Sequence, residues 1–372
     1  MQKLIELKKN ENILVSSKLE SFLKPDYVYL PVLKNNTILV HKNDLVKIGD
    51  EVITGITSPV SGVVSGLKKL NSLQDADYYL EIANDFEERN RKEAGRKKKL
   101  NQESVLNILN LKGKKNLVLN AIDDEVYVST ENFYLFLYYD VFLELLDEIT
   151  SLFSLENIYV CLKASSSENV SKLMSDLGMY PNIILKVVPD LYLLGRPSFL
   201  TSYLNLNAEE TLVVAASEFY DIYNYLKRGR SKRDMLMTIS GDAVKNPIVV
   251  QVKIGTPLAL VMKELVEITE DDVLYFANGL MQGEAINLNS FVVTPNLNSL
   301  IIMKKREEKK EGKCLRCGLC SDICPMHLNP VLLKNPKYAS LIKKECINCG
   351  LCSYICPVYI NFNTYLKGES HE

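Results

Sequence analysis

Eight of the nine cysteines in this 372-residue chain lie in two short runs near its C-terminal end. In each run, successive cysteines are separated by two, two and three residues, and the last cysteine is followed by proline. The first run is Cys314, Cys317, Cys320 and Cys324, and the second is Cys346, Cys349, Cys352 and Cys356. A secreted disulfide framework spreads its bridges along the chain, so this dense clustering indicates a metal site in a reducing compartment.

The repeated spacing is typical of a pair of [4Fe-4S] clusters. Three cysteines separated by two residues can wrap a tight loop around three corners of a cubane, and Gly318 and Gly350 let backbone amides approach its sulfides. In this motif the fourth cysteine ligates the other cluster, so each cluster draws ligands from both runs. The predicted sets are Cys314, Cys317, Cys320 and Cys356 for one cluster, and Cys346, Cys349, Cys352 and Cys324 for the other.

Two structural zinc sites are the alternative for these cysteines. Zinc sites use pairs of cysteines, and a fourth ligand exchanged between runs has no purpose in them. We therefore expect clusters that pass single electrons, and we predict no catalytic residue. His327 is expected at the surface because all eight ligand positions are filled, and Cys161 is expected to be a small buried apolar side chain.

Composition excludes several other classes of protein. Hydrophobic residues make up 47% of the chain, which is enough to build buried cores, and the net charge of -2 argues against nucleic-acid binding. The most apolar segment, from Phe133 to Ile149, is interrupted by acidic residues that include Asp140, Glu144 and Asp147, so no membrane span is expected. The charged N-terminus does not resemble a signal peptide. We expect a cytoplasmic protein that is peripheral on the cytoplasmic face of a membrane only through partner subunits.

The N-terminal region, residues 1–85, has short strands and tight turns between residues 27 and 67. Residues 46–52 follow the pattern V-K-x-G-D-x-V, and residues 58–64 follow S-P-V-x-G-V-V. Together they resemble the barrel-sandwich hybrid of biotinyl and lipoyl domains. Carrier domains of that type place an acceptor lysine at a hairpin tip, but the link 54–57 has none, so we predict a structural module.

The rest of the chain predicts a multidomain protein of the α/β and α+β classes. Residues 102–235 alternate between strands (116–120, 157–162, 183–188 and 211–215) and helices (132–152, 167–177 and 218–227). This alternation indicates an α/β domain with a mainly parallel sheet. Residues 236–303 predict a small α+β module with strands at 248–252 and 299–303 and a helix at 257–266. Residues 304–372 begin with a charged linker and form the cluster domain.

Further motifs resemble the C subunit of the Rnf electron transport complex. Residues 239–247 read I-S-G-D-A-V-K-N-P and residues 254–257 read I-G-T-P, similar to a signature of that family. Segments 120–127 and 278–283 are similar to two more family motifs. The resemblance covers nearly the whole chain. It implies a barrel-sandwich hybrid, a Rossmann-like α/β domain similar to the flavin subunit of complex I, a β-grasp (SLBB) module and a two-cluster ferredoxin-like domain.

The resemblance also implies FMN that accepts hydride from NADH. The positions that match the flavin site are Asn120, Asp123 and Glu125. However, the family has a glycine-rich loop before this point, and here only Gly95 and Gly113 lie between Leu80 and Asn120. They cannot form a phosphate cradle of consecutive amides. The departure argues against FMN binding and more strongly against NADH oxidation, and it leaves strand-end capping as the role of the three polar residues.

We therefore predict an iron-sulfur electron-transfer subunit of the RnfC-like type, which relays single electrons to or from a partner redox protein. One alternative is an NADH:acceptor oxidoreductase with a divergent FMN site, as in the Rnf subunit, cobalamin reductases or the proline-reductase-associated electron transfer protein. Another is a non-redox ligand-binding scaffold with structural clusters. The basic run 227–233 is a candidate docking patch for an acidic partner, with a solvated helix end as its ordinary role.

Overall fold

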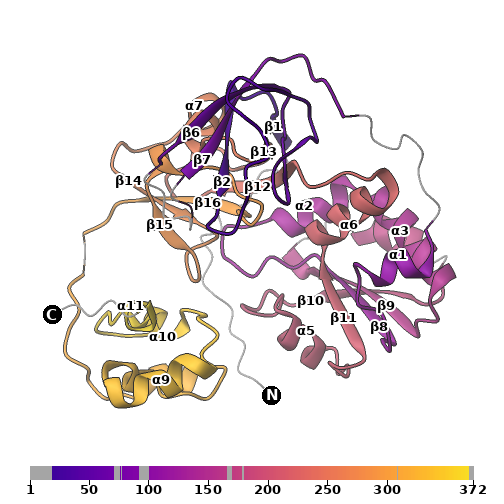
Figure 1. The fold of residues 1–372 in the computed structure, drawn as a ribbon. Coiled ribbons are helices and arrows are strands. Elements are labelled where there is room, and N and C mark those ends of the chain that lie inside the picture. Colours follow the sequence, from indigo (N-terminus) through magenta and orange to yellow (C-terminus); the bar gives the residue numbers. More distant parts are fainter. Residues whose placement is uncertain are drawn as a thin grey trace.

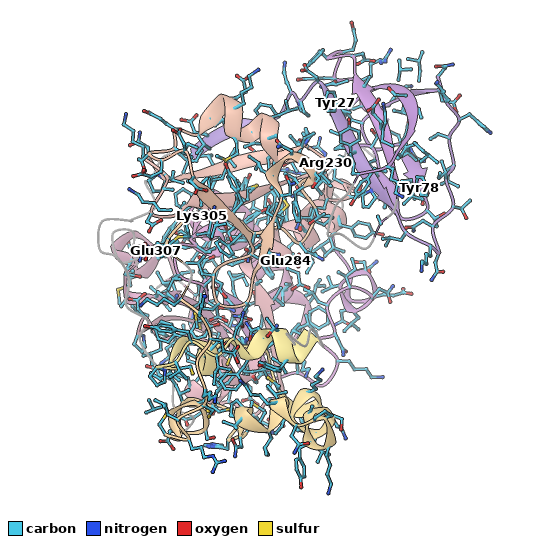
Figure 2. The ribbon with its side chains drawn as sticks, turned by 90° about the vertical axis from the view of Figure 1, so that its left-hand side faces the viewer. Tyr27, Tyr78, Arg230, Glu284, Lys305 and Glu307 are labelled. Carbon is cyan, nitrogen blue, oxygen red and sulfur yellow. The ribbon has the colours of Figure 1, made fainter. Side chains whose placement is uncertain are left out.

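The computed structural model describes residues 19–70, 76, 78–91, 100–165, 170–177, 180–307 and 309–367. Figure 1 shows three parts that contain sheets and a C-terminal module of short helices. In the turned view of Figure 2, Tyr27 and Tyr78 mark the N-terminal strands at one end of the molecule, and Lys305 and Glu307 mark the linker to the C-terminal module. The chain is thus a mixed α/β multidomain protein.

The N-terminal part consists of two small antiparallel sheets. Its strands are β2 (Tyr27–Val32), β3 (Leu45–Val46), β4 (Glu51–Ile53), β5 (Ile56–Thr57), β6 (Gly62–Lys68) and β7 (Tyr78–Asn84). The order β2-β7-β6-β3 forms one sheet, and β4 and β5 form a hairpin. Alternate residues such as Val28, Leu30 and Ile82 are fully buried, because successive side chains of a strand point to opposite faces.

The central part has a parallel sheet in the order β10-β9-β8-β11. Its strands are β8 (Asn116–Asn120), β9 (Asn157–Lys163), β10 (Ile183–Val188) and β11 (Thr211–Ala215), as the sequence predicts. Its helices are α1 (Gln102–Leu106), α2 (Thr130–Leu137), α3 (Tyr139–Leu152), α4 (Val170–Leu177), α5 (Pro197–Tyr203) and α6 (Ala216–Arg228). Helix α6 ends at Gly229, whose φ of 65° stops the helix. Cys161 is fully buried on the sheet face covered by α5, as expected.

Two helical predictions in this part need correction. The single helix expected over 132–152 is two helices, because Tyr138 leaves helical geometry with φ -112° and ψ 28°. The ring of Tyr138 stacks on Tyr220 of α6 at 3.8 Å between centroids, a tertiary contact that sequence periodicity does not reveal. The expected start of the next helix at Ser167 lies outside the described residues.

The third part is a six-stranded sheet in the order β1-β13-β12-β16-β14-β15. Its elements are β1 (Leu19–Phe22), β12 (Asp234–Ser240), β13 (Ile248–Lys253), α7 (Leu258–Leu265), β14 (Val273–Ala277), β15 (Glu284–Ile286), η2 (Leu288–Ser290) and β16 (Ser299–Lys304). Strand β1 pairs in parallel with β13, so a segment before the N-terminal sheets completes this sheet. That pairing joins residues more than 200 positions apart, and no local pattern predicts it.

The C-terminal module has no strand within residues 309–367. Its elements are α8 (Leu319–Ile323), η3 (Pro330–Lys334), α9 (Pro336–Glu345), α10 (Leu351–Tyr354) and α11 (Phe362–Lys367). Helices α8 and α10 occupy equivalent places in the two cysteine runs, and each begins after a glycine. The module therefore repeats one loop-helix unit, as the sequence spacing predicts.

Candidate metal centre

The eight clustered cysteines surround two separate cavities. One cavity is lined by Cys314, Cys317, Cys320 and Cys356, and the other by Cys324, Cys346, Cys349 and Cys352. Each cavity thus takes three cysteines from one run and the last cysteine from the other run. Within the described part of the chain, no group of three or more His, Cys, Asp or Glu residues is arranged to hold a single metal ion.

We call residues 314–320 the outer loop and residues 346–352 the inner loop. The two loops have the same backbone path: Arg316 and Asn348 have φ values of 55° and 51°, and Gly318 and Gly350 have φ values of 82° and 76°. This left-handed backbone turns amide groups toward the sulfur atoms. The N–H of Arg316 donates to Cys314 Sγ at 3.4 Å, and the N–H of Asn348 donates to Cys346 Sγ at 3.4 Å.

The thiols around the second cavity are held in a desolvated environment. Burial, followed by the charges of neighbouring cysteines, raises the pKa of Cys352 to about 12. Burial also raises the pKa of Cys349 and of Cys320 above the usual range of a thiol. Buried thiols such as Cys349 and Cys352 lose their protons near neutral pH when a positively charged centre lies among them. The donor set therefore fits an iron-sulfur cluster. His327 is exposed and lines neither cavity, as expected.

The two equivalent loops differ sharply in what covers them. Leu315 and Leu319 of the outer loop are 64% and 41% exposed, and the Cys317 side chain is also exposed. In the inner loop, Cys349 is 8% exposed and Leu351 is 1% exposed. The two loops thus share a backbone conformation, but the outer loop is exposed to solvent and the inner loop is largely buried.

The inner loop is buried by the α/β domain and by the segment between β14 and β15. Tyr192 Oη donates to the carbonyl of Cys349 at 2.6 Å, and Arg196 donates to the carbonyl of Ile347 at 3.0 Å. A Cβ added to Gly350 would lie 2.5 Å from the carbonyl oxygen of Met281. Apolar side chains complete the contact: Tyr192, Leu193, Phe199, Leu351, Val126, Met281, Ile323 and Ile347. The second cavity therefore lies close to the region where the family resemblance implies a flavin.

The three residues that match the flavin site are engaged with protein atoms instead. Asn120 donates to the carbonyl of Gly195 at 2.6 Å and accepts the N–H of Ile122 at 3.2 Å. Asp123 accepts the N–H groups of Glu131 and Asn132 at 2.9 and 3.2 Å, in the first turn of α2. Both residues thus satisfy backbone groups at the ends of β8 and α2.

Glu125 has the same kind of role at the inner loop. Its carboxylate accepts the N–H groups of Leu280, Met281 and Gln282 at 3.1, 3.0 and 2.9 Å, which fixes the turn that packs on Gly350. Asn120, Asp123 and Glu125 line neither cysteine cavity. Their contacts do not fit a flavin site, and we derive no step through FMN.

Sequence reasoning missed three residues near the inner loop. Asp124 accepts the N–H of Gly195 at 2.7 Å, and burial raises its pKa to about 6. Tyr192 and Arg196 contact the inner loop directly, and the Arg196 guanidinium also donates to Gln282. Tyr192 and Arg196 belong to segment 192–197, which reads Y-L-L-G-R-P. No local pattern in this segment shows which partners the two residues contact, because those partners lie more than 80 residues away along the chain.

Comparison with known proteins agrees with this geometry. A family model described as a 4Fe-4S dicluster domain matches residues 306–357. The chain is 24% identical, over 59% of its length, to the C subunit of the ion-translocating oxidoreductase complex of Pectobacterium atrosepticum. This chain is a relative of the C subunit of Rnf-type complexes. It is also 32% identical, over 30% of its length, to the C subunit of the proton-translocating ferredoxin:NAD(+) oxidoreductase complex of Clostridium ljungdahlii.

The RnfC-like chain covers only part of these relatives. It spans 25% of the Clostridium ljungdahlii protein and 34% of the Pectobacterium atrosepticum protein, and 48% of the related protein from Buchnera aphidicola, to which it is 21% identical. Among solved structures, an NAD+-reducing [NiFe]-hydrogenase in the H2-reduced state has a TM-score of 0.47 at 11% identity, covering 70% of this chain and 57% of that chain. A likeness of this size says nothing about activity.

Proposed function

We propose that this RnfC-like chain is an electron-transfer subunit that relays single electrons through two [4Fe-4S] clusters. The arrangement of eight cysteines around two cavities, with the fourth ligand exchanged, is the observation that carries the proposal. We assign Cys314, Cys317, Cys320 and Cys356 to one cluster, and Cys346, Cys349, Cys352 and Cys324 to the other. A bound cluster of this type accepts and gives one electron at a time.

The backbone of the loops adjusts the electrostatics of these sites. The amides of Arg316 and Asn348 donate to ligand sulfurs, and so does the N–H of Leu328, which lies 3.4 Å from Cys324 Sγ. A hydrogen bond to sulfur stabilises added negative charge, so these amides favour the reduced state. The chain needs no proton donor or acceptor for this role.

Because the inner loop is buried and the outer loop is exposed, only the outer loop is accessible to a separate electron-transfer protein. The inner loop is sealed against the α/β domain through Tyr192, Arg196 and Met281. The outer loop, with Leu315 and Leu319 exposed, is the end at which a separate protein can approach. We propose that the outer loop is the docking surface for the partner redox protein.

Charge indicates the chemistry of that partner. Leaving the cysteines and the clusters aside, residues 306–357 contain nine Lys and Arg residues and five Asp and Glu residues, whereas the whole chain has two more acidic than basic residues. Basic side chains are therefore in excess on the surface of the cluster domain, around the negative charge of the clusters and their thiolates. Complementary charge increases the rate of encounter between electron-transfer proteins, so the preferred partner is acidic.

The relatives are named as subunits of complexes, and the RnfC-like chain is proposed to act as a subunit as well. No helix in the described part is long and apolar enough to cross a membrane. We propose that any contact with the cytoplasmic face of a membrane is made through partner subunits. Washing membranes with concentrated salt should then release the chain, and retention after the wash would contradict this arrangement.

The test of the relay is the cofactor content of the full chain purified without oxygen. We expect about eight iron atoms per chain, broad visible absorption that bleaches on chemical reduction, and no stoichiometric flavin. Stoichiometric FMN together with bleaching by NADH would overturn the proposal and favour an NADH:acceptor oxidoreductase. Clusters that cannot be reduced would also overturn it and favour a scaffold with structural clusters.

The ligand assignment has its own test. We expect Cys356→Ala to remove the cluster of the outer loop, although Cys356 belongs to the second run, and Cys324→Ala to remove the cluster of the inner loop. Cys161→Ala is the control and should keep both, since Cys161 is buried in the α/β domain. Electron paramagnetic resonance of the reduced variants separates the two clusters. Loss of the inner-loop cluster in Cys356→Ala would contradict the exchange.

A further inference from the structure

Arg196 places a cationic group against the inner loop. Its guanidinium donates to the carbonyl of Ile347 at 3.0 Å, and Ile347 lies between Cys346 and Cys349 in the chain. The side chain is half-buried and also donates to Gln282. Burial raises the pKa of the Cys349 thiol, and the charge of Arg196 acts in the opposite direction. The positive charge therefore acts on a residue that lines the inner-loop cavity.

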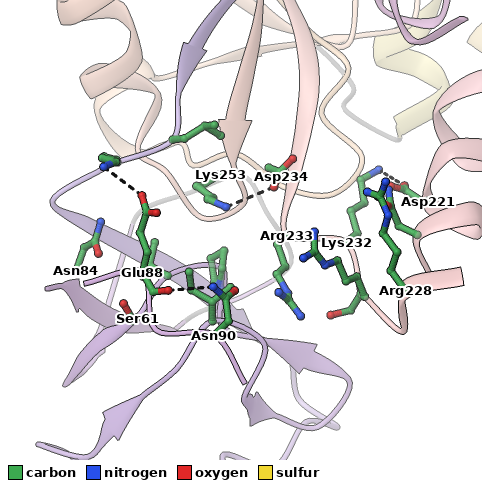
Figure 3. A pocket seen from close by; sticks show the side chains of 18 of the residues that line it. Ser61, Asn84, Glu88, Asn90, Asp221, Arg228, Lys232, Arg233, Asp234 and Lys253 are labelled. Carbon is green, nitrogen blue, oxygen red and sulfur yellow. Dashed lines mark hydrogen bonds and ion pairs between the residues drawn. The ribbon is translucent and has the colours of Figure 1, made fainter. Parts of the chain in front are cut away.

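The contacts of Arg196 differ from those of other half-buried cations. In the cavity between the N-terminal sheets and α6, Lys253 pairs with Asp234 at 3.4 Å (Figure 3). Lys232 pairs there with Asp221 at 2.9 Å. Within the part of the chain that the structure describes, Arg196 has no carboxylate at ion-pair distance, and its hydrogen bonds go to a carbonyl and an amide. Its charge is therefore not cancelled by an ion pair.

Residues at the end of β8 fix the position of Arg196. Asn120 donates to the carbonyl of Gly195 at 2.6 Å, and the carboxylate of Asp124 accepts the N–H of Gly195 at 2.7 Å. A Cβ on Gly195 would lie 2.6 Å from the carbonyl oxygen of Ile122, so this backbone packs directly on the residues that follow β8. Helix α5 begins at the residue after Arg196. The backbone on both sides of Arg196 is thus held in place, which directs its side chain to the inner loop.

The outer loop has no equivalent of this contact. The equivalent carbonyls belong to Leu315 and Cys317, both exposed, and no side chain among the described residues donates a hydrogen bond to them. Water can therefore stabilise added charge at the outer loop. The inner loop is largely buried, and burial alone disfavours an added negative charge. A cation beside the inner loop counteracts this effect of burial.

We propose that Arg196 sets the reduction potential of the inner-loop cluster. Its positive charge stabilises the negative charge that an added electron brings, and it thereby raises the potential that burial lowers. Arg196 acts through the loop, because its hydrogen bond goes to a carbonyl and not to a ligand sulfur. The inference rests on the proposed electron relay. It names the residue that lets an electron pass from the exposed outer loop to the buried inner loop.

Potentiometric titration of the full chain, purified without oxygen, tests this role with dithionite as the reductant and electron paramagnetic resonance as the readout. We expect Arg196→Gln to lower the equilibrium constant for reduction of the inner-loop cluster at least about tenfold, which is about 59 mV for one electron. The outer-loop cluster should change by less than about twofold. The variants Cys324→Ala and Cys356→Ala assign the two signals. At about pH 8 the carboxyl of Asp124 stays ionised, since burial raises its pKa to about 6.

A purely structural role of Arg196 predicts a shift in the opposite direction. If Arg196 only held the inner loop against the α/β domain, its loss would expose the inner-loop cluster to water. Greater exposure stabilises added negative charge, so the inner-loop potential would rise. An unchanged or raised potential in Arg196→Gln would therefore overturn the proposal.

Three further variants separate charge from hydrogen bonding. Arg196→Lys keeps the positive charge, and Tyr192→Phe removes the neutral hydrogen bond to the Cys349 carbonyl, so each should change the equilibrium constant by less than about threefold. Arg228→Gln is the matched control: Arg228 is also half-buried but lines neither cysteine cavity, and its loss should leave both potentials as in the parent chain. A shift in Arg196→Lys as large as in Arg196→Gln would overturn the proposal.

Iron analysis and thermal unfolding accompany each titration. Loss of the inner-loop cluster from Arg196→Gln would show that Arg196 is needed to hold the cluster, and it would overturn the proposal. A parent chain without two reducible clusters would overturn the electron relay and this inference together. Two reducible clusters in the parent chain, with an unshifted inner-loop potential in Arg196→Gln, would overturn this inference alone.

Discussion

The carboxylate of Glu131 is buried at the start of α2 and bonds to the start of α6. It accepts the N–H and the hydroxyl of Ser217 at 2.8 and 2.7 Å. Burial, followed by the charge of Asp123, raises the pKa of Glu131 to about 7. The ionised form is therefore disfavoured in the folded chain relative to the unfolded chain.

The sign of the pH dependence follows from this shift. A carboxyl group with a raised pKa binds more protons when folded than when unfolded, so the free energy of unfolding falls as pH rises from about 4.5 to about 7. We expect Glu131→Gln to reduce this fall by about 2 kcal/mol. Urea unfolding without oxygen, followed by circular dichroism at about pH 5 and about pH 8, measures it.

Glu218→Gln is the control for this prediction. Glu218 lies on the exposed side of α6, so its removal should leave the pH dependence of unfolding as in the parent chain. If the free energy of unfolding falls by the same amount between the two pH values in Glu131→Gln and in Glu218→Gln, the raised pKa of Glu131 does not contribute to the pH dependence of stability.

At the scale of elements, the inner and outer loops form a natural pair for comparison. Gly350 and Gly318 have φ values of 76° and 82°, so alanine introduces a similar backbone strain, on the order of 1 kcal/mol, at both. The surroundings differ, because a Cβ on Gly350 would lie 2.5 Å from the Met281 carbonyl, whereas on Gly318 its nearest neighbour is Asp322 at 4.0 Å. We expect Gly350→Ala to lower the unfolding temperature and the iron content more than Gly318→Ala does.

The Gly350→Ala and Gly318→Ala variants also define the result that would contradict this prediction. Thermal unfolding and iron analysis of the two variants without oxygen give the comparison directly. Equal losses in both variants would mean that the contact between the inner loop and Met281 contributes nothing to stability. Each loss is measured against the parent chain. The backbone strain is similar at the two glycines, so it cancels when the two losses are subtracted from each other.

The elements also show what the sequence reveals about the fold. Strands β8, β10 and β11 have the predicted bounds, because each is a short apolar run between polar or turn residues. Helix α5 was not predicted. It has only seven residues, Pro197–Tyr203, which is too short for a clear helical periodicity in the sequence. The pairing of β1 with β13 was also missed, because strand pairing over a long separation leaves no local pattern.

The site was predictable to a similar extent. The spacing of the cysteines predicts the two groups that line the cavities, since ligand spacing is set by the geometry of the cluster. The burial of the inner loop was not predictable, because the two loops have nearly the same local sequence and differ only in tertiary contacts. Glu125 illustrates the same limit: its three amide partners lie about 155 residues away along the chain.

At the scale of the whole molecule, basic side chains are in excess in one segment. Residues 306–357 have nine Lys and Arg residues against five Asp and Glu residues, and the outer loop, which places Leu315 and Arg316 at the surface, is the accessible end of the proposed relay. An acidic electron-transfer protein should therefore reduce the chain faster at low ionic strength than at high ionic strength.

Leu315→Glu tests this docking surface. The side chain of Leu315 is 64% exposed, but the residue also lines the cavity of the outer loop, so the iron content of the variant is measured beside its rate and only a variant with the parent iron content is compared. The substitution places a negative charge in an apolar contact facing an acidic partner, and we expect the rate of reduction by a plant-type ferredoxin to fall at least about tenfold at low salt. Leu67→Glu, at a half-exposed position on β6, is the matched control and should keep the parent rate. Stopped-flow absorption measures both rates, and a Leu315→Glu rate equal to the parent rate at every salt concentration would place the partner on another surface.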